Sequence, residues 1–359
     1  KLTPPPSRGV TFVARPRLLE LLTQGSHAGT TLVSAPAGFG KTTLVADYIR
    51  SVDAPAAWLS LDAGDNDPAR FLAALLAALR NVDPGIGVTA QAMLDTVAPP
   101  PVESLLATLV NDLAAFARPL ILALDDYHVI HLSAIHALVG FLLEHRPAHM
   151  HIVIVTREDP PLPLARLRAR AVLVEVRQGD LSFTFEEVAE FLRRNMTARL
   201  SHAEIAALHD RSEGWVAGLQ LAVLSSRAGG GDMRRLITSV TGTNRFILDY
   251  LTEEVLARQS PQVHSFLLHT SILDRMCAPL CEAMLGQDGW LPQDSDTPAQ
   301  APHALPAQDI LEHLDRSNLF IVPLDTERQR YRYHHLFAEL LQSCLQRELA
   351  DRVNTLHSR

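Results

Sequence analysis

The sequence predicts an α/β fold with a mainly parallel sheet, followed by a helical region and a winged-helix-like module. Over the first 180 residues, short apolar runs alternate with segments of helical periodicity, which is typical of βαβ units with helices on both faces of a sheet. Beyond that point the strand signal fades and helix-capping patterns replace it. Close to the end, a helical pattern precedes two short strand-like segments, and a last helix follows them.

Five strands are expected in the first region, each a short apolar run. They are Thr30–Ser34, Ala56–Leu61, Pro119–Leu124, His151–Thr156 and Val172–Val176. A helix is predicted from Lys41 to Arg50, directly after a turn rich in Pro, Ala and Gly. Asp67 is expected to cap a second helix that runs through Arg80, because the Pro68 that follows it suits the first helical position.

Helices dominate the expected second region. The segments Thr184–Glu187 and Ser201–Glu204 both have the spacing of a capping box. The helix after Ser201 is expected to stop at Gly214, and another is expected to begin near Trp215–Leu224. A loop at Gly229–Gly231 and helical spacing over Arg245–His269 complete this region.

The last part of the chain predicts a winged-helix module. Gln287–Gln308 is dense in Pro, Asp, Gln and Ala and has little periodicity, so we expect a flexible insertion there. Ile310–Leu349 then predicts a helix, a strand pair around Leu319–Leu324 and Arg330–Tyr333, and a final helix. A helix followed by a small hairpin is typical of winged-helix folds.

Composition excludes several classes of protein. Hydrophobic residues make up 47% of the 359, which excludes a largely disordered chain. The net charge of −8 argues against a nucleic-acid-binding surface on these residues. No apolar run is long enough to span a bilayer, so we expect no membrane partner and a cytoplasmic location. Because the first residue is not Met, we also expect a fragment whose true start has been removed.

The three cysteines, Cys277, Cys281 and Cys344, are too few for a disulfide framework. A metal site built on them would need further ligands nearby, and none has the spacing. We expect small apolar core residues, in keeping with a reducing cytoplasm.

The strongest functional signal is a glycine-rich segment that ends in Gly40-Lys41-Thr42, behind a strand and ahead of a helix. That context is typical of a phosphate-binding loop. Gly38 and Gly40 allow the backbone to curl so that successive N–H groups point at phosphate oxygens, while the helix directs its positive end at the same anion. Lys41 adds a charge at the β- and γ-phosphates, and the Thr42 hydroxyl suits a Mg²⁺ ligand.

The loop therefore predicts a site for a nucleoside triphosphate with Mg²⁺. Its candidate binding residues are Ala35, Ala37, Gly38, Phe39, Gly40, Lys41, Thr42 and Thr43. Ala35 stands where such loops usually have their first glycine. That position tolerates alanine as long as its φ angle stays negative.

Two carboxylates follow the apolar segment Leu120–Leu124. A buried strand that ends in carboxylates places them at the sheet edge where ligands bind in open α/β folds. Asp125 is expected to hold Mg²⁺ through water, with Thr42 as the second metal residue, and Asp126 to orient or deprotonate the attacking water. Taken alone, two aspartates after a strand indicate only a solvated turn. The phosphate loop upstream favours the functional interpretation.

Arg157 follows another predicted strand, in Thr156-Arg157-Glu158-Asp159. An arginine at this edge has the reach and the bidentate donors to detect a γ-phosphate. An arginine–carboxylate pair within the turn is the alternative interpretation. The candidate catalytic residues are thus Lys41, Asp125, Asp126 and Arg157.

An ordered set of segments resembles the nucleotide-binding core of the MalT-like, large LuxR-type bacterial transcriptional regulators. These regulators belong to the signal-transduction ATPases with numerous domains. The matching segments are Val13–Leu18, Ser34–Leu44, Leu122–His128, Thr156–Arg170, Leu181–Leu192, Glu213–Leu221 and Tyr331–Phe337. A phosphate loop alone is shared by many families, but this set in this order is specific.

The resemblance implies three domains that clamp ADP in a resting state. They are a P-loop nucleotide-binding domain at 1–180, a helical domain at 181–255 and a winged-helix-like domain at 256–359. It implies that Phe12–Arg17, with Arg15, lies near the adenine, that Arg157 senses phosphate, and that His334 or His335 contacts the β-phosphate. Val216 stands where the family often has a proline that packs on the base.

The resemblance also implies partners. Family members continue into a helical-repeat sensor for an inducer and a C-terminal DNA-binding domain, and neither is found in this sequence. ATP with an inducer would favour an open, self-oligomerising form, and ADP a closed monomer, with slow hydrolysis between them. Two alternatives remain: a turnover P-loop ATPase acting on a macromolecular partner, and a scaffold with a vestigial loop. The joint presence of Lys41, Thr42 and Asp125 argues against the scaffold.

Overall fold

The computed structural model describes residues 1–6, 12–96, 100–196, 200–228, 240–286 and 305–349. The chain divides into two compact units. The first comprises Lys1–Ala35 and Gly40–Leu181, and the second comprises Pro36–Phe39 and Ser182–Arg359. The predicted loop at Gly229–Gly231 and most of the predicted insertion at Gln287–Gln308 lie outside the described residues.

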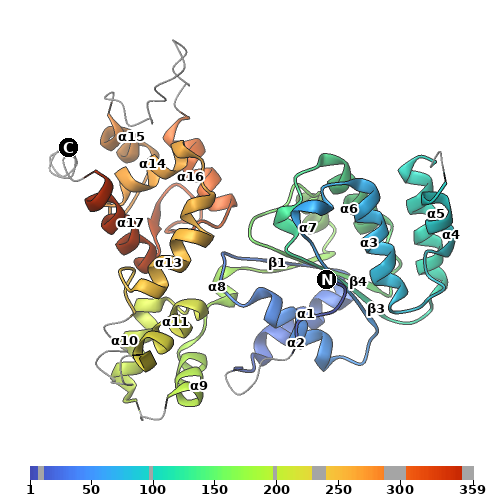
Figure 1. Cartoon of the computed structure of the whole chain (residues 1–359), viewed down its shortest axis with the longest axis horizontal. Helices are drawn as coiled ribbons and strands as arrows, with labels where there is room; N and C mark the ends of the chain where they lie inside the picture. The colour runs from blue at the N-terminus through green and yellow to red at the C-terminus, as the bar shows by residue number, and fades with distance from the viewer. Residues whose placement is uncertain (7–11, 97–99, 197–199, 229–239, 287–304, 350–359) are drawn as a thin grey trace. The chain divides into compact units, whose positions relative to one another are not determined.

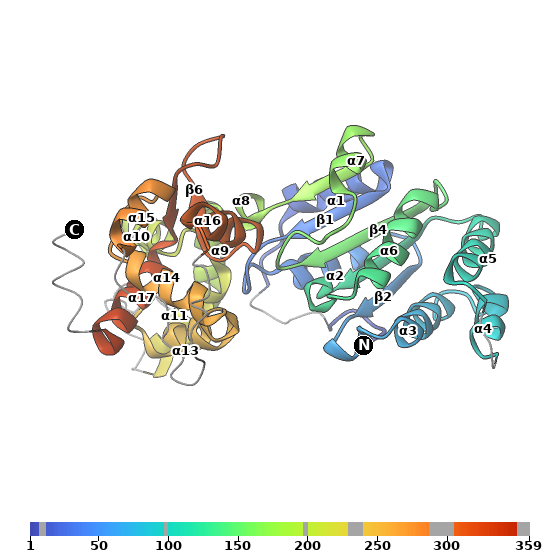
Figure 2. The ribbon, with the colours of Figure 1, turned by 90° about the horizontal axis from the view of Figure 1, so that it is seen from above.

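The first unit is built on a five-stranded parallel sheet in the order β2-β3-β4-β1-β5. The strands are β1 (Thr30–Ser34), β2 (Ala56–Ser60), β3 (Leu120–Asp125), β4 (Met150–Thr156) and β5 (Leu173–Val176). All five lie where the apolar runs predicted them. The order itself places β4 between β1 and β3, which no local pattern indicates. Figure 2 shows β1 and β4 side by side.

Helices cover both faces of this sheet (Figure 1). Leu32 and Ile152 belong to a buried core shared with α3 (Pro68–Arg80) and α6 (Ser133–His145). Because strand side chains alternate, their neighbours point to the opposite face. There α1 (Pro16–Ala28) packs on β1 and β4, and α2 (Lys41–Ser51) packs on β3 and β4. The remaining helices of this unit are α4 (Val88–Leu94), α5 (Val102–Ala115), α7 (Leu164–Ala169) and α8 (Gln178–Leu181).

Predicted caps are confirmed at three helix starts. The Asp67 side chain accepts a hydrogen bond from the Arg70 amide, 2.8 Å away, with Pro68 in the first turn. Thr184 and Glu187 form a reciprocal capping box at α9 (Phe185–Asn195), and Ser201 and Glu204 form one at α10 (His202–Ser212). Each cap supplies an acceptor to an amide that the helix cannot satisfy, which contributes about 1 kcal/mol.

The second unit is mainly helical and contains the predicted winged-helix elements (Figure 1). The helix α16 (Ala307–Arg316) is followed by an antiparallel pair, β6 (Ile321–Pro323) with β7 (Tyr331–Tyr333), and then by α17 (His335–Glu348). The other helices are α11 (Val216–Ala228), α13 (Arg245–Glu254), α14 (Pro261–Thr270) and α15 (Ala278–Leu285).

Two boundaries differ from the sequence prediction. Ala307 and Gln308 form the first turn of α16 rather than the end of an insertion, because Ala307, Ile310, Leu311 and Leu314 make a buried stripe at helical spacing. The helix α10 ends at Ser212, where Glu213 adopts a left-handed conformation with φ 49°. The division of the second unit at residue 255 stays a prediction.

Cys281 and Cys344 are buried, as expected of core residues, and Cys277 is half-buried at the start of α15. Burial raises the pKa of the Cys281 thiol to about 12. Within the described part of the chain, no helix is both long and apolar enough to cross a membrane.

A buried histidine predicts how the stability of the first unit depends on pH. His151 on β4 lies with its Nε2 2.8 Å from Thr31 Oγ1 on β1, and burial, with Arg146 nearby, lowers its pKa from 6.5 to about 4. The neutral ring is favoured in the folded state, so its stabilisation is complete above pH 6.5 and is lost as the pH falls toward 4. We expect a loss on the order of 3 kcal/mol over that window.

Urea unfolding at pH 7.5 and pH 4.5 checks this, with the buried Trp58 on β2 as fluorescent reporter and the other two tryptophans replaced by Phe. His151→Gln, which does not titrate, should reduce the difference between the two pH values. If the free energy of unfolding changes by the same amount between the two pH values in the parent and in His151→Gln, His151 is not the source of the pH dependence.

Candidate functional site

The segment between β1 and α2 has the backbone of a phosphate-binding loop. Gly38 and Gly40 adopt left-handed φ angles of 82° and 79°, which glycine reaches without strain. Ala35 is buried and is not among the described residues with positive φ. Its backbone therefore meets the condition under which alanine replaces the first glycine. The helix α2 begins at Lys41, directly after Gly40 as its N-cap.

The strand order brings three separate motifs to one edge of the sheet. All five strands run parallel, so the carboxyl ends of β1, β4 and β3 lie side by side in that order. The loop follows β1, Arg157 follows β4, and Asp125 ends β3. Ligands of open parallel sheets bind at this edge. The structure therefore gathers these candidate residues although they lie far apart in the sequence.

Thr42 and Asp125 meet directly. The Thr42 hydroxyl donates to Asp125 Oδ1 at 2.9 Å. Asp125 is buried, and burial together with the Asp126 charge raises its pKa to about 6. One hydroxyl and one carboxylate oxygen at this spacing fit Mg²⁺, which proteins commonly hold with one or two side chains plus phosphates and water. The described residues contain no group of three or more His, Cys, Asp or Glu suited to an all-protein metal site.

Lys41 is a buried cation at the start of α2. Its Nζ donates to the Ala35 carbonyl at 2.7 Å, across the curl of the loop. Burial, with the nearby charge of Arg157, lowers the pKa of Lys41 to about 7, against the opposing pull of Asp126 and Asp125. Keeping this lysine charged therefore costs free energy. An anion beside it would offset that cost.

Asp126 follows β3 and Arg157 follows β4, so both lie on the same side of the strand that leads into the loop. Asp126 has φ 57°, a left-handed conformation that aspartate tolerates better than most residues, and its carboxylate is 46% exposed, 3.9 Å from His128 Nδ1. Arg157 is half-buried. In the same segment, Asp159 pairs with Arg177 and accepts from Ser34 Oγ at 3.3 Å. The carboxylate of this turn thus pairs with Arg177, which follows β5, and a pair of Arg157 within the turn stays a prediction.

The candidate adenine segment lies at the start of α1. Arg15 is buried and is the N-cap of that helix. Its Nη2 lies 3.4 Å from the Asp180 carbonyl, and Arg17 Nη1 donates to the same oxygen at 2.6 Å. The guanidinium groups thus tie the start of α1 to α8. A role in base binding stays a prediction.

The tip of the loop, Pro36–Phe39, belongs to the second unit. Trp215 Nε1 donates to the Ala37 carbonyl at 3.0 Å, and the Ala217 amide donates to the Gly38 carbonyl at 3.1 Å. The Phe39 ring lies 6.1 Å from that of Phe320. Sequence reasoning missed these partners of the loop, although the Glu213-Gly214-Trp215 segment stood out through the family resemblance.

The two candidate histidines have different environments. His334 is fully buried: its Nε2 lies 3.0 Å from the Ser212 carbonyl, its Nδ1 accepts from the Leu336 amide at 3.3 Å, and burial lowers its pKa to about 4. His335 is exposed, with Nδ1 3.2 Å from Glu213 Oε1. Either as a phosphate contact stays a prediction.

A bidentate ion pair accompanies these histidines. Arg332 binds both carboxylate oxygens of Glu213, at 2.8 and 2.7 Å, and the His335 amide donates to the same carboxylate at 2.9 Å. The pKa of Glu213 lies at about 2, because these donors and the His334 ring outweigh the opposing effect of burial. The strained Glu213 at the end of α10 is thereby tied to β7 and the start of α17.

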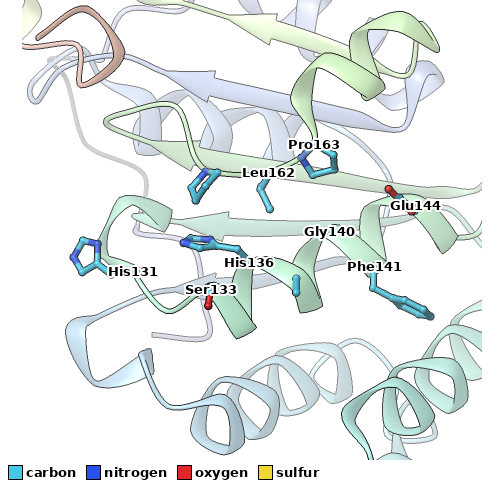
Figure 3. A pocket seen from close by; sticks show the side chains of 10 residues that line it. His131, Ser133, His136, Gly140, Phe141, Glu144, Leu162 and Pro163 are labelled. Carbon is cyan, nitrogen blue, oxygen red and sulfur yellow. The ribbon is translucent and has the colours of Figure 1, made fainter. Parts of the chain in front are cut away.

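A pocket of about 810 Å³ lies in the first unit, and none of the residues that line it belongs to the loop (Figure 3). One face of α6, including His136 and Phe141, lines it together with Pro161–Pro163. The His136 ring also lies 3.0 Å from the Tyr127 hydroxyl. The lining is mostly apolar and contains no lysine or arginine, so it does not suit a polyphosphate.

Comparisons with known proteins agree with this architecture. The profile of the MalT winged helix domain matches residues 252–353. The HTH-type transcriptional regulators MalT of Serratia proteamaculans (strain 568) and Cronobacter sakazakii (strain ATCC BAA-894) are 34% and 33% identical over 98% and 96% of this chain. The chain is MalT-like. It spans 37% and 36% of the lengths of those two relatives.

The fold of this MalT-like chain is also similar to that of a solved Walker-type ATPase. The solved structure of the Walker-type ATPase PABY2304 of Pyrococcus abyssi has a TM-score of 0.62 and 15% identity. The similarity covers 94% of this chain and 98% of that one. The expected fold class, a parallel P-loop sheet followed by helices and a winged helix, is therefore confirmed.

The two loop glycines offer a matched pair of substitutions. A Cβ at Gly40 meets nothing within 4 Å, so Gly40→Ala adds only the strain of a positive φ, about 1–2 kcal/mol. A Cβ at Gly38 would lie 2.6 Å from Ala217 Cβ and 2.7 Å from Trp215 Nε1, so Gly38→Ala adds a steric clash. We expect Gly38→Ala to lower the melting temperature more than Gly40→Ala. Equal decreases in thermal unfolding scans would show that this packing is absent.

Proposed function

We propose that this chain is the nucleotide switch of a transcriptional regulator: it binds ATP or ADP with Mg²⁺ and hydrolyses ATP slowly. The contact between Thr42 and Asp125 beside the glycine-curled loop supports this most strongly, because it joins the two expected metal residues from segments 83 residues apart. A loop kept only for packing needs neither this contact nor a buried lysine beside it.

The electrostatics of the site support an anionic ligand that carries a cation. Burial lowers the pKa of Lys41 and raises the pKa of Asp125, so it favours the neutral form of each side chain. A polyphosphate beside Lys41 and a Mg²⁺ ion beside Thr42 and Asp125 would supply the opposite charge to each. Mg²⁺, when bound, would neutralise charge on the β- and γ-phosphates. Adenine nucleotides combine both components in one ligand.

The chain's own residues divide the remaining work. Asp126 has an exposed carboxylate at the end of β3, from which it would orient or deprotonate the attacking water. Arg157, at the end of the neighbouring β4, would report the γ-phosphate. Arg15 would lie near the adenine, and His334 or His335 would contact the β-phosphate of ADP after a rearrangement of the hydrogen bonds that both now make.

Use as a switch requires that the state of the nucleotide reach other parts of the chain. The loop tip is part of the second unit, held there by Trp215 and Ala217. Whatever moves the tip on nucleotide binding therefore acts on this unit, and the coupling is reciprocal. ATP and ADP would favour different arrangements, and the ATP form would self-associate.

DNA and inducer binding are assigned to sequence beyond these residues. The relatives named HTH-type transcriptional regulator MalT are longer, and this chain spans 37% of the first of them. The net charge of −8 also disfavours DNA binding by the chain itself. We propose that the nucleotide state of this core controls those outlying functions in the cytoplasm.

Lys41→Ala should abolish nucleotide binding, because it removes the cation at the β- and γ-phosphates. The native chain, first freed of bound nucleotide, should show a higher melting temperature with saturating ATP–Mg²⁺, since a ligand that binds only the folded state stabilises it by about 2.7 kcal/mol at 100 times its Kd. Lys41→Ala should show no rise. Arg50→Ala, at the other end of α2, is the control and should respond like the native chain. A native chain that does not respond would contradict the proposal.

Slow hydrolysis predicts retained product. Denaturing the freshly purified chain should release ADP in roughly stoichiometric amount, and added ATP should turn over slowly, at a specific rate that does not rise with protein concentration. Asp126→Asn should slow hydrolysis without weakening ATP binding. Rapid multiple turnover would instead favour a working ATPase that acts on a macromolecular partner.

A further inference from the structure

Two hydrogen bonds hold the outer side of the phosphate loop. The carbonyl of Ala37 accepts from the Trp215 indole at 3.0 Å, and the carbonyl of Gly38 accepts from the Ala217 amide at 3.1 Å. Trp215 directly precedes α11, and Ala217 lies in its first turn, where helix amides lack partners of their own. Successive carbonyls of the loop thus point toward one end of α11.

Peptide geometry then fixes where the loop amides point. The described chain contains no cis peptide bond, and in a planar trans peptide the C=O and N–H groups point in opposite directions. The Ala37 carbonyl shares its peptide with the Gly38 amide, and the Gly38 carbonyl shares its peptide with the Phe39 amide. Because both carbonyls face α11, both amide hydrogens face away from it. Those amides are the donors with which such a loop binds phosphate.

The indole that makes the first bond is held rigidly. Trp215 is fully buried, and its ring lies 5.3 Å from Phe320 at 84° and 5.7 Å from Tyr250 at 53°. A Cβ at Gly218 would lie 2.3 Å from the indole, so that glycine lets the helix backbone approach the ring. The Nε1–H therefore has one direction available, and the Ala37 carbonyl occupies it. A ring packed on three sides orients its acceptor rather than following it.

We propose that Trp215 is a positioning residue for phosphate binding: its indole N–H turns the Ala37–Gly38 peptide so that the Gly38 amide faces the ligand. This inference rests on the proposed nucleotide site and names a residue that acts on it from outside the loop. Reciprocity then requires that bound nucleotide strengthen the Trp215–Ala37 hydrogen bond, because one peptide carries both contacts.

Trp215→Phe tests the first half, because it keeps an aromatic ring and removes the N–H. After bound nucleotide is removed from both proteins, we expect ADP–Mg²⁺ to bind the variant about fivefold more weakly than the native chain by titration calorimetry, the effect of one lost net hydrogen bond. Trp58→Phe is the matched control: Trp58 is equally buried and its indole donates to Ser60 Oγ at 2.8 Å, within β2 of the first unit. It should lose stability and keep its affinity for ADP.

The indole proton itself supplies a readout that packing alone would not change. With ¹⁵N-tryptophan in the chain, Trp58→Phe and Trp290→Phe assign two of the three indole N–H signals and leave the third to Trp215. The exchange of these protons with deuterium is followed with and without ADP–Mg²⁺. The Trp215 proton should exchange several-fold more slowly when ADP is bound, and the Trp58 proton should exchange at an unchanged rate. This measurement does not depend on how well Trp215→Phe folds.

The outcomes separate the two proposals. If the native chain does not bind ADP–Mg²⁺ at all, the proposed function fails and the role of Trp215 fails with it. If the native chain binds ADP but Trp215→Phe binds equally well and the Trp215 proton exchanges at one rate throughout, only the positioning role is overturned. Weaker binding in both Trp215→Phe and Trp58→Phe would indicate general destabilisation and would also overturn it.

Discussion

The direction of the peptide groups between β1 and α2 is the constraint on which the rest of the molecule depends. Several features impose it together: the left-handed angles of Gly38 and Gly40, the start of α2 at Lys41, and the hydrogen bonds from Trp215 and Ala217. None of these suffices alone, since glycine permits a curl without choosing its direction. The loop is therefore shaped by its own sequence on one side and by α11 on the other.

The site also contains two buried groups whose charged forms are disfavoured by burial. Lys41 is shifted toward its neutral form and Asp125 toward its protonated form, although each lies near the other's charge. Burial outweighs their mutual attraction because it removes the water that would solvate them. Such a site gains most from a ligand that carries both signs of charge. Burial thus explains both why the site favours such a ligand and why keeping Lys41 and Asp125 charged costs free energy.

The parts of the structure that sequence could predict are local ones. The strands, the caps at Asp67, Thr184 and Ser201, and the left-handed glycines of the loop depend on residues only a few positions apart, so periodicity and spacing reveal them. The strand order and the contacts of Trp215 join distant segments, and no short pattern encodes them. His334 shows the same limit: its type suggests chemistry, whereas burial and the Ser212 contact come from the tertiary fold.

The assignment of Pro36–Phe39 to the second unit bears on how this chain can be divided. Phe39 has no exposed surface, and its ring packs near Phe320, far along the sequence. A shortened protein that ended near Leu181 would keep every strand of the parallel sheet and yet present this phenyl ring to water. Self-association and poor solubility of such a truncated protein would then reflect the exposed ring, even with the sheet intact.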